Sequence, residues 1–206
     1  MKTADQSSAL SERSGNTPLP IQPAIYPLDS FYARAGRPLP PIEIIAAEEM
    51  PQPYRALLVH DVDMTSTLER FHGGRVHLEI LLRDQRDDFY FRQLTLNLDR
   101  TGRRVEFGAI RINLGLFKPV PRQLIQDGVL PLGRILQQCS VPYNSRPKAF
   151  LRIQSDDYIN TALGFEGSHT LYGRRNTLTD PRQRALAEIV EILPPERGPG
   201  KKKAVG

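Results

Sequence analysis

The sequence predicts an α+β fold, a single domain with an antiparallel β-sheet flanked by short helices, and three observations support it. Apolar side chains alternate with polar ones in several segments between residues 76 and 178, which is typical of half-buried strands. Polar turns join the first of these segments directly, so neighbouring strands run antiparallel. Between residues 119 and 139 the apolar spacing changes to that of short helices. Strands, short helices and further strands in this order favour α+β over a doubly wound fold.

The individual elements follow from local signals. We expect a helix over 61–71, because Asp61 or Asp63 can cap it and because Met64, Leu68 and Phe71 share one face. Three strands are then predicted at 76–83, 89–98 and 105–117, and two short helical segments at 122–128 and 131–139. Two further strands are predicted at 147–154 and 169–178.

Residues 179–193 are compatible with two structures. A good N-cap and Pro181 near the first helical position favour a helix. The β-branched run from Ile189 to Leu193, which ends before Pro194, is also acceptable as a final strand. The pattern alone does not decide between them.

The chain divides into three parts by composition. Nine of the 18 prolines lie in the first 53 residues, and prolines lack the amide donor that ladders and helices need. We therefore expect a proline-rich arm over 1–50, largely extended or disordered, whose apolar side chains can dock on the core. The folded domain is expected over 51–195, and 196–206 should form a flexible basic tail.

Composition excludes several classes of protein. The chain has 206 residues, 39% hydrophobic and 25% charged, with a net charge of +5, as expected for one globular domain with extensions. One cysteine, Cys139, and four scattered histidines argue against disulfides and against a metal site. No apolar run is long enough to insert into a membrane, and the N-terminus lacks a signal sequence. We expect a cytoplasmic monomer or dimer that does not bind nucleic acid.

Two charged residues interrupt apolar strand faces. Arg92 shares a face with Tyr90, Leu94 and Leu96, and an unpaired buried guanidinium would be costly. If 179–193 ends in a strand, Glu191 interrupts another apolar face in the same way. The two residues can form a buried structural ion pair, or they can be the two poles of a small polar pocket. The doublet Arg174-Arg175 is expected, on composition, to be exposed.

The sequence resembles the chorismate pyruvate-lyase (chorismate lyase) superfamily through five segments in order: DMTSTLERF, YFRQLTL, LPLGRIL, LYGRRNTL and IVEILPP. The resemblance covers roughly residues 54–195. It implies an antiparallel sheet that encloses a buried ligand pocket beneath helical flaps, with a strand as the last element. It also implies an enzyme, a carbon–oxygen lyase that eliminates pyruvate from chorismate to give 4-hydroxybenzoate.

The resemblance assigns roles to individual positions. Arg92 corresponds to the arginine that binds the ring carboxylate, and Glu191 to the glutamate that faces the ring hydroxyl, with a role as general base. The backbone at Met64 and Leu132 would help to hold the ligand. The family's Gly-Arg pair is replaced by Gly108-Ala109, so Arg111 or Arg174 would have to hold the second carboxylate. No metal and no organic cofactor is implied, and the partners are chorismate and the aromatic acid product.

Two other functions remain open. The chain can be a non-catalytic or divergent homologue that binds a related aromatic carboxylate. It can also be an interaction protein whose segment PLPPIE serves as a polyproline II ligand.

Overall fold

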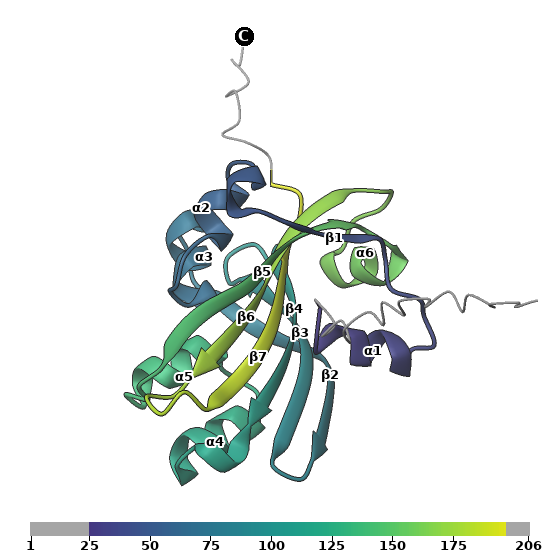
Figure 1. Ribbon diagram of the computed structural model, residues 1–206. Coiled ribbons are helices and arrows are strands. Elements are labelled where there is room, and N and C mark those ends of the chain that lie inside the picture. Colours follow the sequence, from purple (N-terminus) through teal and green to yellow (C-terminus); the bar gives the residue numbers. More distant parts are fainter. Residues whose placement is uncertain (1–24, 197–206) are drawn as a thin grey trace, which may run out of the picture.

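The structure, a computed structural model, describes residues 25–196 and has one antiparallel seven-stranded sheet at its centre (Figure 1). The strand order is β1-β5-β6-β7-β4-β3-β2. The strands are β1 (Ile42–Ile45), β2 (Val76–Arg86), β3 (Phe89–Leu98), β4 (Arg104–Asn113), β5 (Asn144–Gln154), β6 (Thr170–Thr179) and β7 (Ala185–Leu193). The helices are α1 (Leu28–Arg34), α2 (Tyr54–Leu58), α3 (Met64–His72), α4 (Pro119–Asp127), α5 (Leu132–Gln138) and α6 (Asp157–Leu163). Two 3-10 turns are η1 (Ala47–Glu49) and η2 (Leu114–Leu116). The predicted α+β fold is confirmed.

Strands β2, β3 and β4 form consecutive hairpins, as the alternating pattern predicts. The first turn places Asp87 at φ 52°, and the second places Gly102 at φ 66°. Both are left-handed conformations, which Asp tolerates and Gly adopts without strain. The two short turns hold β3 between β2 and β4, so that Arg92 lies in the interior of the sheet.

The segment that the sequence left open is strand β7, and it lies in the middle of the sheet between β6 and β4. Asp180, which resembles a helix N-cap residue in the sequence, stabilises a turn instead. The Asp180 side chain accepts hydrogen bonds from the backbone N–H groups of Arg182 and Arg184, both at 2.9 Å, and so shapes the β6–β7 turn. An acidic side chain that accepts hydrogen bonds from nearby backbone N–H groups is typical of turns as well as of helix N-termini.

Helices cover both faces of the sheet (Figure 1). Helices α2 to α5 pack on one face, where they form the larger apolar core with β2, β3, β4 and β7. Helices α1 and α6 pack on the opposite face, where Phe31, Tyr32 and Leu163 join a second core. The helix expected over 61–71 is α3: Asp63 caps it by accepting a hydrogen bond from Ser66 N–H at 2.8 Å. Among residues 25–196, no helix is long and apolar enough to cross a membrane.

Residues 25–50 differ from the extended arm that the prolines suggest. Helix α1 buries Leu28, Phe31 and Tyr32, and strand β1 pairs with β5 at one edge of the sheet. The Tyr32 hydroxyl donates to the carboxylate of Asp156, the N-cap of α6, at 2.9 Å. Part of the expected arm is therefore integral to the fold. The rest of the arm, 1–24, and residues 197–206 of the expected tail lie outside the described residues.

Candidate functional site

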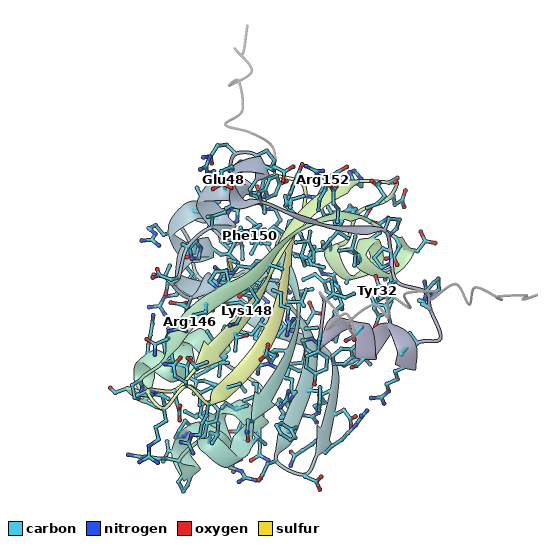
Figure 2. The ribbon with its side chains drawn as sticks, viewed as in Figure 1. Tyr32, Glu48, Arg146, Lys148, Phe150 and Arg152 are labelled. Carbon is cyan, nitrogen blue, oxygen red and sulfur yellow. The ribbon has the colours of Figure 1, made fainter. Side chains whose placement is uncertain are left out.

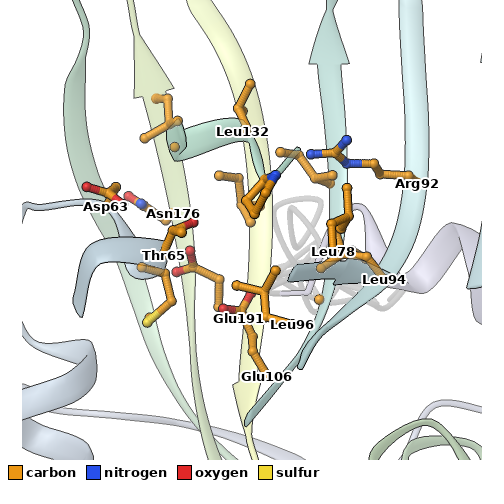
Figure 3. A pocket seen from close by; sticks show the side chains of 18 residues that line it. Asp63, Thr65, Leu78, Arg92, Leu94, Leu96, Glu106, Leu132, Asn176 and Glu191 are labelled. Atoms are coloured by element: carbon orange, nitrogen blue, oxygen red, sulfur yellow. The ribbon is translucent and has the colours of Figure 1, made fainter. Parts of the chain in front are cut away.

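A cavity of about 60 Å³ lies between the sheet and the N-terminal ends of α3 and α5 (Figure 3). It exceeds the roughly 10–15 Å³ that one water molecule needs. Leucine side chains supply much of its wall, and Arg92, Glu106 and Glu191 are the charged residues that the sheet contributes. The lining residues are Asp63, Met64, Thr65, Leu78, Arg92, Leu94, Leu96, Glu106, Gly108, Ala109, Ile110, Pro131, Leu132, Gly133, Asn176, Leu178, Ile189 and Glu191.

Strand register explains why these residues meet. Leu94, Gly108, Glu191 and Arg174 form one row across β3, β4, β7 and β6. Arg92 lies in the adjacent row, opposite Ile110 of β4. Side chains two apart on a strand share a face, so all of them face α3 and α5.

Gly108 provides the space at the centre of this face. A Cβ atom at Gly108 would lie 3.1 Å from Glu106 Oε1 and 3.3 Å from the Val190 carbonyl oxygen. These contacts are tighter than ordinary packing allows. A side chain here would therefore press on Glu106 and fill the floor of the cavity.

Arg92 is buried without a protein partner. Its side chain is 1% exposed, and Nε and Nη1 have no hydrogen-bond partner among the described residues. Within the same part of the chain no carboxylate comes within 4.0 Å of its guanidinium. Burial lowers the pKa of Arg92 to about 10, which still leaves the side chain charged at neutral pH. A buried cation without an anion is unfavourable, and it is the arrangement expected where a ligand supplies the anion.

Glu191 is already paired, but with Arg174 instead of Arg92. Arg174 is 0% exposed and its Nε donates to Glu191 Oε2. The same guanidinium donates to three backbone carbonyls at 2.9–3.3 Å, that of Leu58 at the end of α2 and those of His60 and Val62 in the loop between α2 and α3. Of the two alternatives for Arg92 and Glu191, the structural ion pair is therefore not formed, and the expectation of an exposed Arg174 is wrong. Arg174 fixes both Glu191 and the loop that leads into α3.

Glu106 is a second buried carboxyl group in the cavity. It is 4% exposed, and its Oε2 has no hydrogen-bond partner among the described residues. Burial, reinforced by the neighbouring charge of Glu191, raises the pKa of Glu106 well above its usual range, and Arg174 offsets this only in part. Figure 3 shows Arg92 on one side of the cavity and the carboxyl groups of Glu106 and Glu191 on the other.

The structure brings together four of the five site residues that the resemblance assigns: Met64, Arg92, Leu132 and Glu191 all line the cavity. Arg111 does not. It pairs with Glu188 in the β4–β7 register, on the opposite face of β4 from Ile110, and its guanidinium stacks over Phe89 at 4.1 Å. Arg111 comes three positions after Gly108 and one after Ile110, which both face the cavity, so the alternation of the strand places Arg111 on the opposite face and excludes a role beside Arg92.

The sequence analysis does not identify Glu106, and it predicts the wrong exposure for Arg174. The alternation of apolar and polar residues along the strands nevertheless marks both. Glu106 is the one charged position among Glu106, Gly108, Ile110 and Ile112, which share a face of β4. Arg174 stands between Tyr172 and Asn176 on a face of β6 that is mostly buried. Arginine doublets are usually exposed to solvent, so the doublet favours exposure of Arg174 although the alternation indicates burial.

A wider polar groove adjoins the cavity at Asp63, which lines both. The groove has a volume of about 840 Å³ and lies between the α2–α3 loop and β5. Arg146 and Lys148 of β5 line it (Figure 2). Among residues 25–196, no three His, Cys, Asp or Glu side chains converge as a metal centre would require.

Comparison with known proteins gives relatives in structure alone. No family model and no curated protein matches the sequence. PhnF from Mycobacterium smegmatis superposes with a TM-score of 0.53 at 10% identity, over 81% of this chain and 92% of that one. The separate effector domain of PhnF gives a TM-score of 0.51 at 12% identity, over 66% and 90%. The C-terminal domain of the histidine utilization repressor from Pseudomonas syringae gives 0.42 at 13%, over 62% and 98%. At these identities the likeness concerns the fold.

These neighbours share the fold, but they contradict the predicted lyase. One of the two that superpose with a TM-score above 0.5 is described as an effector domain and not as an enzyme. The site agrees with this correction, because the carboxylate expected to act as general base is engaged by Arg174. The structure therefore gives no support to Glu191 as a catalytic residue.

Proposed function

We propose that this chain is a ligand-binding domain that holds a small aromatic carboxylate in the cavity without converting it. One observation carries the proposal: Arg92 presents an unpartnered, buried guanidinium to an otherwise largely apolar cavity. A ligand carboxylate would supply the missing anion, and charge-assisted hydrogen bonds to arginine are among the stronger ones in proteins.

Two further features support a binding role. The leucine-rich wall suits an apolar ring, and pockets of this kind combine apolar walls with a few polar groups that fix orientation. The neighbouring groove carries Arg146 and Lys148, whose positive charges favour the approach of an anion. The fold is also that of the effector domain of PhnF.

Calorimetric titration with two isosteric probes tests the proposal. We expect 4-ethylbenzoate to bind and 4-ethylbenzamide to bind at least about tenfold more weakly, because only the carboxylate can pair with Arg92. The substitution Arg92→Met should abolish that preference. Arg34→Met, which removes an exposed arginine from α1 on the opposite face of the sheet, is the matched control and should bind like the wild type. Equal binding of the acid and the amide to the wild type would refute the proposal.

A further inference from the structure

The cavity contains a second group that lacks a partner, and its sign is opposite to that of Arg92. Glu106 lies on β4 and Arg92 on β3, and the residue opposite Arg92 is Ile110, four positions after Glu106. Strand geometry places the two Cα atoms roughly 14 Å apart. Leu94 and Gly108 lie between them on the floor of the cavity.

Among the residues that the structure describes, no cation is available to Glu106. Arg174 is the nearest basic group on the sheet, but donors on all three of its nitrogens are directed to Glu191 and to the backbone carbonyls of Leu58, His60 and Val62. Within residues 25–196 no basic nitrogen lies within 4.0 Å of the Glu106 carboxyl group. The other acidic groups near the cavity are Glu191 on β7, which is paired, and Asp63, which caps α3.

The geometry points to a zwitterionic ligand, with a carboxylate at the Arg92 end, a protonated nitrogen at the Glu106 end and a short apolar spacer between them. This inference rests on the proposed function and extends it to the far end of the ligand. A neutral ligand group would need only a neutral partner, such as an amide side chain. A buried acid without a counter-ion is the residue type expected where the ligand itself brings a positive charge.

The charges then balance in the complex. In the empty cavity burial and the charge of Glu191 raise the pKa of Glu106, which favours its protonated form. When the ligand ammonium arrives, Glu106 releases its proton to the buffer and becomes the counter-ion of that ammonium. Arg92 pairs with the ligand carboxylate, and Arg174 stays paired with Glu191. Every buried charge then has a partner of opposite sign.

Three ligands of nearly equal shape test the inference: 4-ethylbenzoate, 4-(hydroxymethyl)benzoate and 4-(aminomethyl)benzoate. Titration calorimetry at pH 7 in two buffers of different ionisation enthalpy gives both the affinity and the number of protons released. We expect the amino compound to bind about tenfold or more tightly than the ethyl compound. Its binding should release about one proton per site, whereas the other two should release none.

Glu106→Gln keeps the size of the side chain and removes its charge. We expect it to abolish the preference for the amino compound and the proton release, with binding of 4-ethylbenzoate retained. Glu48→Gln, at an exposed position, is the control and should change neither. If 4-ethylbenzoate binds and the amino compound binds no better, or binds without proton release, the zwitterion inference is refuted while the proposed function stands. If none of the three benzoates binds, the proposed function itself fails.

Discussion

Arg174 connects more of the molecule than any other residue of the site. Its guanidinium neutralises Glu191 on β7 and donates to one carbonyl at the end of α2 and to two of the α2–α3 loop, while its own strand is β6. Removal of one partner from a buried pair leaves the other charge uncompensated, and this loss is larger than the net contribution of the pair.

We therefore expect Arg174→Met to lower the free energy of unfolding by about 3–5 kcal/mol. Arg34→Met removes a comparable side chain from the surface of α1 and should change stability by no more than about 0.5 kcal/mol. Urea denaturation at pH 7 measures both. A loss for Arg174→Met that is no larger than that of the control would show that the loop and Glu191 do not depend on this residue.

Glu106 should leave a signature in the pH dependence of stability. Unfolded, its carboxyl group ionises near the ordinary value of about 4.3. Folded, its pKa is raised well above that by burial and by Glu191, so above about pH 4.3 the native state binds one more proton than the unfolded state. The free energy of unfolding therefore falls as pH rises, by about 1.4 kcal/mol per pH unit until the folded group ionises.

Glu106→Gln removes this term and leaves every other titrating group in place. The variant should gain stability relative to the wild type as pH increases from 5 to 7, because only the wild type carries the buried acid. Urea denaturation of both proteins across this range gives the comparison. Stability profiles that run parallel would mean that Glu106 titrates normally and that its environment is not as described.

Among the elements, the pairing of β6 with β7 depends on close backbone approach at Gly173. A Cβ atom there would lie 2.5 Å from the Glu191 carbonyl oxygen, so any side chain would push the two central strands apart. Gly173 stands directly before Arg174 in the LYGRRNTL segment. Close approach of the strands brings Arg174 opposite Glu191.

Gly173→Ala should therefore destabilise the protein by about 1–3 kcal/mol, the usual cost of forcing an extra methyl group into a packed site. Gly74→Ala is the control, because a Cβ atom at Gly74 would have no neighbour within 4 Å. Thermal unfolding of the two variants distinguishes them. A melting temperature for Gly173→Ala equal to that of the control would contradict the close approach of β6 and β7.

Elements with strong local periodicity could be predicted from the sequence, and elements fixed by partners far along the chain could not. The hairpins of β2 to β4 and helix α3 follow from alternation, turns and a cap. Strand β7 and the helix α1 depend on surfaces that distant segments provide. Arg92 could be predicted as a site residue because it interrupts an apolar face. Its lack of a partner depends on the ion pair of Glu191 with Arg174 of β6, and no local pattern specifies that pair.

In the molecule as a whole, the two faces of the sheet differ in the kind of residue that they bury. The face beneath α1 and α6 carries an apolar core that contains Phe107, Leu151 and Ile192, beside buried neutral polar side chains such as Gln93 and Thr95. The face beneath α3 and α5 carries the cavity and three buried charged residues of the strands, Arg92, Arg174 and Glu191, together with the acid Glu106. One face stabilises the fold, and the other gives up part of that stability, as expected for the proposed ligand site. Sites of this kind are expected to be less stable than an apolar replacement.

The stability of Arg92→Met measured without ligand tests this account most directly. If Arg92 has no partner in the protein, methionine should fill the same space without a buried charge, and the free energy of unfolding should rise by about 1–3 kcal/mol. Urea denaturation of wild type and variant at pH 7 gives the difference. A variant less stable than the wild type by a similar amount would show that Arg92 is held by the protein itself, and the proposed ligand site would be contradicted.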